Sequence, residues 1–209
     1  MSVKIARCSQ QASAWPRQGR HILAQYDDET ILVYQAYNPK IGRYALRHQH
    51  FGGDFSYGRM SWIKPNFLWM MYRSAWGTNI NQECVLALRL RRDFFDLLLS
   101  EAVASSIAQS HIESPHAWKD AVRNSEVRLQ WDPDRAPDGR PLERRAIQIG
   151  LRGKRLRGFG TDEIVEIIDM TKLVNEQRER VGTEELMTPA ETRYLPGDPA
   201  IFARIGLEA

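Results

Sequence analysis

The sequence predicts an α+β fold with a mainly antiparallel sheet and packed helices. Segments typical of strands and helices are interspersed without regular βαβα alternation, which favours antiparallel pairing. Two segments, 127–132 and 146–151, alternate apolar and polar residues and are joined by a stretch rich in Pro, Asp and Gly. They are expected to pair as a hairpin. With 209 residues, 43% of them hydrophobic, the chain is long enough to bury one core without disulfides.

Three regions are expected along the chain. Residues 1–19 lack periodicity and predict an N-terminal arm, residues 20–174 a single globular domain, and residues 175–209 an acidic tail or helix. Within the domain, the β-branched and aromatic run 30–35 predicts a strand. The following Asn-Pro marks a turn, and 40–50 predicts a short helix ended by two glycines. Pro65 suits the first turn of a helix that continues to about residue 75.

The second half of the domain alternates between strand and helix patterns. Leu and Ala/Arg alternate over 85–91, which predicts a half-buried strand. Asp93 then begins a helix to about residue 108, and Ser114-Pro115 begins a short one. Thr161-Asp162-Glu163 has the acidic first turn of a helix start.

Charge is unevenly distributed. The net charge is only +3, but 135–157 holds eight basic residues against two acidic ones, and 161–209 holds five basic against eleven acidic. An anion-binding surface partly covered by the acidic end is one interpretation, and a solvated face with a polar terminal helix is the other. No apolar run is long enough for a membrane span. Two distant cysteines and the absence of a signal peptide predict a cytoplasmic protein.

The densest feature is the segment 57–76, with six aromatic residues in twenty. On a helix, Trp69, Tyr72 and Trp76 share a face, and Arg73 lies beside it. A buried core helix explains the aromatics, but it does not explain Lys64 and Arg73, because no acid lies in 55–82 to pair with them. A phosphate, or a carboxylate from elsewhere, would be their partner.

Two further groups suit a ligand. Arg20 is close in sequence to four polar or aromatic residues that predict either a stacking pocket or ordinary strand residues. The polar faces of three expected strands carry Arg and Gln, which suits a nucleotide or RNA if the strands are adjacent and otherwise a solvent-facing sheet. The residues of the first group are Tyr26, Tyr34, Gln35 and Tyr37; those of the second are Arg89, Arg91, Arg128, Gln130, Gln148 and Arg152.

Few acidic residues are candidates for a catalytic role. Glu83 precedes a strand and Asp132 ends one, so either is a candidate general base or ribose-hydroxyl acceptor, or else structural. No metal is expected, because His48 and His50 lack a third ligand at a familiar spacing. The segment 150–160 has glycines and four basic residues but no P-loop ending, which predicts a basic loop.

Several blocks resemble a known family. They are RHILAQYDDETILVYQAY, RMSWIKPNFLWMMYRSAW, VRLQWDPDR and RAIQIGLRG. Together they are similar to bacterial and fungal proteins of roughly 200 residues known only as a domain of unknown function. The resemblance covers about 20–174 and implies no activity.

A second resemblance is to compact ADP-ribosyltransferase-like domains. It implies that Arg20 binds the diphosphate of NAD, that Ser61 takes the middle-strand position, and that Glu83 contacts a ribose hydroxyl. An aromatic residue such as Tyr34 or Trp62 would stack on nicotinamide. The Gln82-Glu83 pair lacks the usual intervening residue, and the block around Ser61 differs from the family pattern.

The leading hypothesis is a nucleotide-binding enzyme, specifically an NAD-dependent transferase of ADP-ribosyl type, with no metal and no membrane partner. The alternative is a non-catalytic RNA-binding module that uses the basic segment 135–157. The sequence predicts no oligomeric state. Its expected catalytic residues are Glu83, Ser61 and Asp132; its expected ligand-binding residues are Arg20, Tyr26, Tyr34, Gln35, Tyr37, Arg59, Trp62, Lys64, Trp69, Tyr72, Arg73, Gln130, Gln148 and Arg152.

Overall fold

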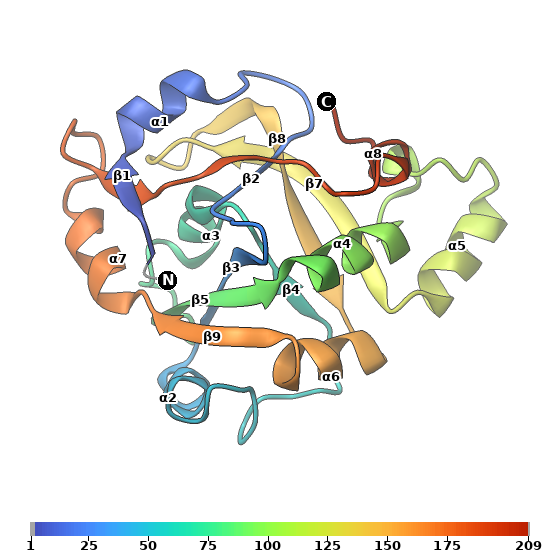
Figure 1. Ribbon diagram of the computed structural model, residues 1–209, viewed down its shortest axis with the longest axis horizontal. Coiled ribbons are helices and arrows are strands. Elements are labelled where there is room, and N and C mark those ends of the chain that lie inside the picture. The colour runs from blue at the N-terminus through green and yellow to red at the C-terminus, as the bar shows by residue number, and fades with distance from the viewer. Residues whose placement is uncertain (1–2, 209) are drawn as a thin grey trace.

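Two mainly antiparallel sheets organise the computed structural model, which describes residues 3–208 (Figure 1). The first has the order β3 (Thr30–Tyr37), β5 (Cys84–Arg91), β9 (Ile164–Asp169). The second has the order β4 (Ser61–Ile63), β8 (Pro141–Leu151), β7 (Val127–Arg135), β6 (Val103–Ala104). All pairs are antiparallel except β6 with β7. The predicted α+β class and the predicted hairpin are therefore confirmed.

The main core lies between the two sheets. Inward residues of both sheets, such as Ile63, Leu88 and Trp131, are buried there with Phe95 from α4 (Arg92–Glu101). A second apolar cluster covers the opposite face of β3 and β5, where α3 (Phe67–Ser74) packs. Strand β5 is consequently covered on both faces, in contrast to the half-buried strand that we predicted. The alternating residue Ala87 is fully buried, since alanine tolerates either environment.

Asparagine side chains cap the N-termini of two helices. Asn38 accepts hydrogen bonds from the backbone N–H groups of Lys40 and Ile41 and caps α2 (Pro39–His48). Asn66 accepts from the N–H of Trp69, 2.7 Å away, and caps α3. Such caps satisfy backbone donors that the first helical turn leaves free. Helix α3 therefore begins two residues after Pro65, slightly later than predicted.

The expected helix start at residues 161–163 is wrong. Those residues end α6 (Gly153–Thr161), which occupies most of the predicted basic loop, and lead into β9. The β-branched run from Ile164 to Ile168 forms a strand because it completes the sheet beside β5. The next helix is α7 (Thr171–Arg178). Helix α4 also ends at Glu101, earlier than the predicted residue 108, and is followed by β6, the 3₁₀ turn η1 (Ile107–Gln109) and α5 (Pro115–Asn124).

Segments near both ends of the described residues form strands and helices, where we expected an arm over 1–19 and an acidic tail or helix over 175–209. Strand β1 (Ile5–Arg7) pairs with β10 (Met187–Pro189), and β2 (Ile22–Ala24) pairs with β11 (Thr192–Tyr194). Helices α1 (Cys8–Ala14) and α8 (Ala200–Ile205) accompany them (Figure 1). Short strands of this kind carry little periodicity and gain their stability from each other. Among residues 3–208, no helix has the length and hydropathy to cross a membrane.

Replacing Trp15 with Ala tests whether the N-terminal segment is structural. The indole is 7% exposed and its Nε1–H donates to the carbonyl oxygen of Glu191, 2.9 Å away. Loss of a buried aromatic side chain should lower the free energy of unfolding by about 3 kcal/mol, measured by urea denaturation. Gln10→Ala, at an exposed position of α1, should change it by less than about 0.5 kcal/mol. Equal effects from both variants would restore the interpretation of a loosely attached arm.

Candidate functional site

Five polar or aromatic side chains share one face of the second sheet. Gln130 of β7 and Gln148 of β8 are direct cross-strand partners. Trp62 of β4 is opposite Gly150 of β8, and because these strands are antiparallel, Lys64, two residues after Trp62, is level with Gln148. Asp132 lies two residues further along β7 on the same side, because strand residues alternate between faces. We call these residues the Lys64 face: Trp62, Lys64, Gln130, Asp132 and Gln148.

The amine of Lys64 is held in an unusual environment. Its side chain is buried, with the residue 5% exposed, and its Nζ lies 5.0 Å from the ring centre of Trp69 and 3.5 Å from the carbonyl oxygen of Trp62. The pKa of Lys64 is lowered to about 7, mainly by burial and also by the positive charge of Arg73, while the negative charge of Asp132 acts in the opposite direction. A lysine with such a pKa is partly neutral at physiological pH and can act as a base or nucleophile.

Asp132 fixes the orientation of two amide groups. The Nε2 of Gln130 donates to its Oδ1 at 2.8 Å, and the Nε2 of Gln148 donates to its Oδ2 at 2.7 Å. The amide oxygens are thereby set as acceptors, and that of Gln130 lies 3.4 Å from the Oγ donor of Ser105. All three side chains of this carboxylate–amide set are half-buried. They form a hydrogen-bonded polar surface next to Lys64.

Trp62 lies directly over Gly150. A Cβ atom at Gly150 would come within 3.0 Å of two indole atoms and 2.8 Å of the sulfur of Met60. Only glycine leaves room for the indole against the strand at this point. The outer surface of this half-buried ring is a platform on which a planar group can stack.

Ser61 points to the opposite side of β4. It lines a cavity of about 560 Å³ together with Tyr37, Arg59 and Gln82. Its Oγ accepts from the Nε2 of Gln35 at 2.8 Å and lies 3.0 Å from the hydroxyl of Tyr37, whose pKa burial raises. The oxygens Oε1 of Gln35 and Gln82 are buried without a hydrogen-bond partner among the described residues.

A buried carboxylate positions α3 beside the Lys64 face. Glu191 accepts from the backbone N–H of Phe67 at 2.7 Å and lies 3.4 Å from Nδ2 of Asn66, both at the start of α3. Burial raises the pKa of Glu191 well above its usual range. The contact fixes the helix that carries Trp69 and Arg73.

The predicted site residues do not form one cluster. Gln35, Tyr37, Arg59 and Ser61 gather at the cavity, and Lys64, Trp62, Gln130, Asp132 and Gln148 gather on the Lys64 face with Trp69 and Arg73 at its edge. Tyr34 is fully buried in the second apolar cluster, with its ring edge against Phe67. Tyr72 is exposed and stacks under the guanidinium of Arg135, 3.8 Å from the ring centre.

The structure does not bring Arg20 to Ser61. The backbone of Arg20 forms an isolated β-bridge with Arg145 of β8. Arg145 is six residues along this strand from Leu151, which pairs with Ser61. Six strand residues span about 20 Å. Tyr26 is also elsewhere, donating its hydroxyl to the carbonyl oxygen of Arg193. Sequence proximity to Tyr34 and Gln35 was therefore misleading for these two residues.

Glu83 lies at the entrance of β5, next to Gln82. Its Oε1 accepts from the backbone N–H of Asn81 at 3.0 Å, and its Oε2 is buried without a partner in the described part of the chain. Among the residues 3–208, no three His, Cys, Asp or Glu side chains gather at a metal-binding distance.

The basic segment 135–157 does not form one continuous surface. Arg144 is buried in an ion pair with Asp134, Arg155 pairs with Glu101, and Arg152 donates to the carbonyl oxygen of Ser125. Arg89 and Arg91 belong to the other sheet, so they are not beside Gln130 and Gln148 as we expected. Arg89 is buried and pairs with Glu166.

Sequence reasoning missed Gly150 and Glu191. A glycine inside a strand pattern signals a close approach, so the first could have been found. Glu191 lies in a segment without periodicity, and nothing local connects it to α3.

The fold and the site define an α+β protein with a buried, partly neutral lysine on a polar sheet face. The chain matches the model of the family described as domain of unknown function DUF4291 over residues 21–197 and belongs to that family. The match extends past residue 174, where we expected the resemblance to end. No curated protein matches the chain.

The pKa of Lys64 can be measured by competitive labelling with acetic anhydride, read by mass spectrometry for each lysine. The expected apparent pKa of Lys64 is about 7, against about 10.4 for an exposed lysine. Arg73→Gln should raise it and Asp132→Asn should lower it, because the two charges act in opposite directions. An unchanged value in both variants would contradict the electrostatic coupling.

Replacing Lys64 with Met should stabilise the protein. Between about pH 7 and 10 the unfolded chain holds a proton on Lys64 that the folded chain does not, so the free energy of unfolding should rise with pH in this window. Below pH 7 burial of the charge costs a few kcal/mol, since one pK unit is about 1.4 kcal/mol.

Lys64→Met should therefore raise the melting temperature most below pH 7 and flatten the pH dependence above it. Thermal unfolding from pH 6 to pH 10 tests both effects. A lower melting temperature in this variant at pH 6 would show that the amine contributes stability instead of removing it.

Proposed function

We propose that the Lys64 face binds a nucleotide-type, phosphate-bearing ligand and that Lys64 is the reactive base of a group-transfer reaction. The observation that carries the proposal is the burial of its amine, with a pKa of about 7, beside an oriented carboxylate–amide set. A buried lysine is costly, and perturbed groups of this kind concentrate at functional sites.

Each side chain of the face has a role in this proposal. Trp62 offers its ring to the base, as aromatic platforms do for nucleobases. The amide oxygen of Gln148 accepts from the ligand, since Asp132 holds the amide nitrogen. Arg73, which is exposed at the edge of the face, binds a phosphate.

Lys64 then takes the proton of an attacking hydroxyl. The hydroxyl oxygen forms the new bond to the transferred group, and the bond to the leaving group breaks with its electron pair. The negative charge of Asp132 stabilises the ammonium ion that results, and for the same reason it raises the pKa of Lys64. A pKa near the working pH is the value that a general base needs.

NAD remains a candidate ligand, but it would not bind through the residues that the resemblance to ADP-ribosyltransferase-like domains implies. That scheme needs Arg20, Ser61 and Glu83 around one ligand. Ser61 faces away from Lys64 across β4, and Arg20 is about 20 Å along β8 by strand rise. RNA remains the alternative ligand.

Thermal unfolding with NAD, ADP-ribose, ATP and single-stranded RNA tests the proposal. A nucleotide at about 100 times its Kd should add about 2.7 kcal/mol to the free energy of unfolding. The gain should disappear in Trp62→Ala and Lys64→Met, each compared with its own unliganded melting temperature. It should persist in Lys154→Met, at an exposed position of α6.

Two outcomes would contradict the proposal. One is a nucleotide-induced gain that survives in both Trp62→Ala and Lys64→Met. The other is stabilisation by RNA alone that weakens steeply as salt rises, which would favour the RNA-binding alternative.

A further inference from the structure

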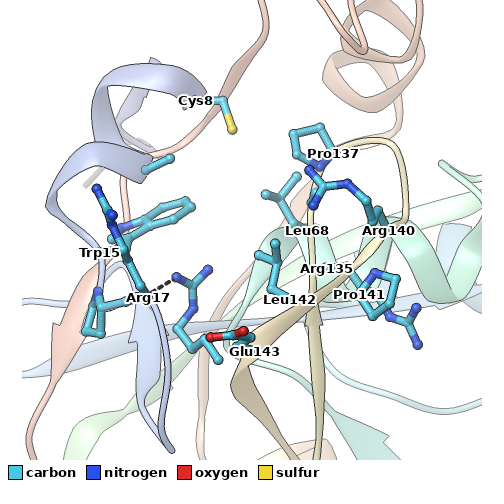
Figure 2. Close-up of a pocket in the computed structure, with 14 residues that line it drawn as sticks. Cys8, Trp15, Arg17, Leu68, Arg135, Pro137, Arg140, Pro141, Leu142 and Glu143 are labelled. Atoms are coloured by element: carbon cyan, nitrogen blue, oxygen red, sulfur yellow. Dashed lines mark hydrogen bonds between the residues drawn. The ribbon is translucent and has the colours of Figure 1, made fainter.

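A separate cavity of about 540 Å³ lies between α1 and the turn that joins β7 to β8. Figure 2 shows Trp15 on one side of it and Leu68 and Leu142 on the other, with Cys8 above. None of the Lys64-face residues lines it. Its volume suits a small organic ligand.

The floor of this cavity is apolar. Cys8, Trp15 and Leu68 are each less than 9% exposed and come from three separate elements of the fold. Much of the cavity wall is formed by Pro16, Pro137 and Pro141. An apolar body of one or two rings would be removed from water here, which is the main favourable contribution to binding in such pockets.

The rim is positively charged. Four arginines and one glutamate line the cavity: Arg17, Arg135, Arg140, Arg144 and Glu143. Arg144 is compensated, because its Nη2 lies 2.6 Å from Oδ2 of buried Asp134 and another nitrogen donates to the Pro16 carbonyl oxygen. The remaining three arginines and one glutamate leave a charge of +2 around the opening.

The other three arginines make no close ion pair within residues 3–208, although Arg135 stacks on Tyr72. Arg17 makes no ion pair or hydrogen bond with any residue between 3 and 208. Arg140 is exposed and its Nε lies 3.8 Å from Asp138, at the limit of an ion pair. Arg135 donates Nη1 to the Gly139 carbonyl oxygen, whereas its Nε is buried without a partner in the described chain. A buried donor without a partner is costly and indicates a missing acceptor.

We infer that this cavity binds an amphipathic organic anion, with an aromatic or acyl body on the Trp15–Leu68 floor and an anionic head at the arginines of the rim. A guanidinium binds carboxylate and phosphate heads in the same two-pronged way, so the shared chemistry is one oxyanion on an apolar body. Strongly hydrated polyphosphates do not fit, because the floor offers them no polar partner.

Isothermal titration calorimetry with three naphthalene probes tests the inference on the full chain. The probes are 2-naphthoate, 1-naphthyl phosphate and the uncharged 2-naphthalenemethanol. At least one anion should bind 10-fold or more tightly than the uncharged probe, and the stronger anion identifies the preferred head. Equal binding of all three, or no binding at 1 mM, would overturn the inference.

Variants locate the binding. Arg17→Ala/Arg140→Ala should weaken the anion at least 10-fold, whereas Arg43→Ala/Arg47→Ala, an exposed pair on α2, should leave it unchanged. Ala12→Trp fills the cavity from an exposed position of α1 and should abolish binding of the anions. Undiminished binding in Ala12→Trp would place the probe elsewhere and overturn the inference.

Discussion

The contact between the buried carboxylate of Glu191 and the start of α3 holds the rest of the structure in place. The backbone N–H of Phe67 is left free by the helix and is directed at Glu191 Oε1, 2.7 Å away. Trp15 is joined to the same residue through the Glu191 carbonyl oxygen. One residue thus connects the two chain ends to the helix that borders the candidate site.

The candidate site shows the usual conflict between stability and function. Lys64 occupies a position where an apolar side chain would be more favourable, and its amine faces Arg73 as well as Asp132. The surrounding strands tolerate this because the central residues of their other faces are buried in the apolar core: Ile63, Leu129 and Ile149 are each at most 2% exposed. A well-packed core on one side of a sheet therefore supports an unfavourable charge on the other.

Local features of the fold were predictable, and pairing between distant segments was not. The alternation in 127–132 and 146–151 identified the hairpin because one face of each strand is buried. Pro65 located one helix start, and a second helix begins at Pro39, in the Asn38-Pro39 pair that we interpreted as a turn before it. The alternation of 85–91 was ambiguous, because Ala87 fits a buried face as well as an exposed one. The paired ends, β1 with β10 and β2 with β11, are joined by contacts more than 160 residues apart.

The site was predicted in its parts but not in its arrangement. Lys64, Asp132 and the two glutamines were identified by residue type, and only the register of β4, β8 and β7 shows that they share a face. Arg20 was grouped with Tyr34 because they are close in sequence, and strand pairing separates them. Glu191 could not be predicted, because a lone acid in a polar segment has no local sign of burial.

The late position of Glu191 also has a consequence for the order in which the protein is made. Helix α3 leaves the ribosome well before the residue that anchors it, since more than 120 residues separate Phe67 from Glu191. During that interval the nascent chain carries Trp69 and Arg73 on a helix whose first turn has no anchor, and β1 has no partner strand. The contacts that join α3 and β1 to the C-terminal segment therefore form only near the end of synthesis.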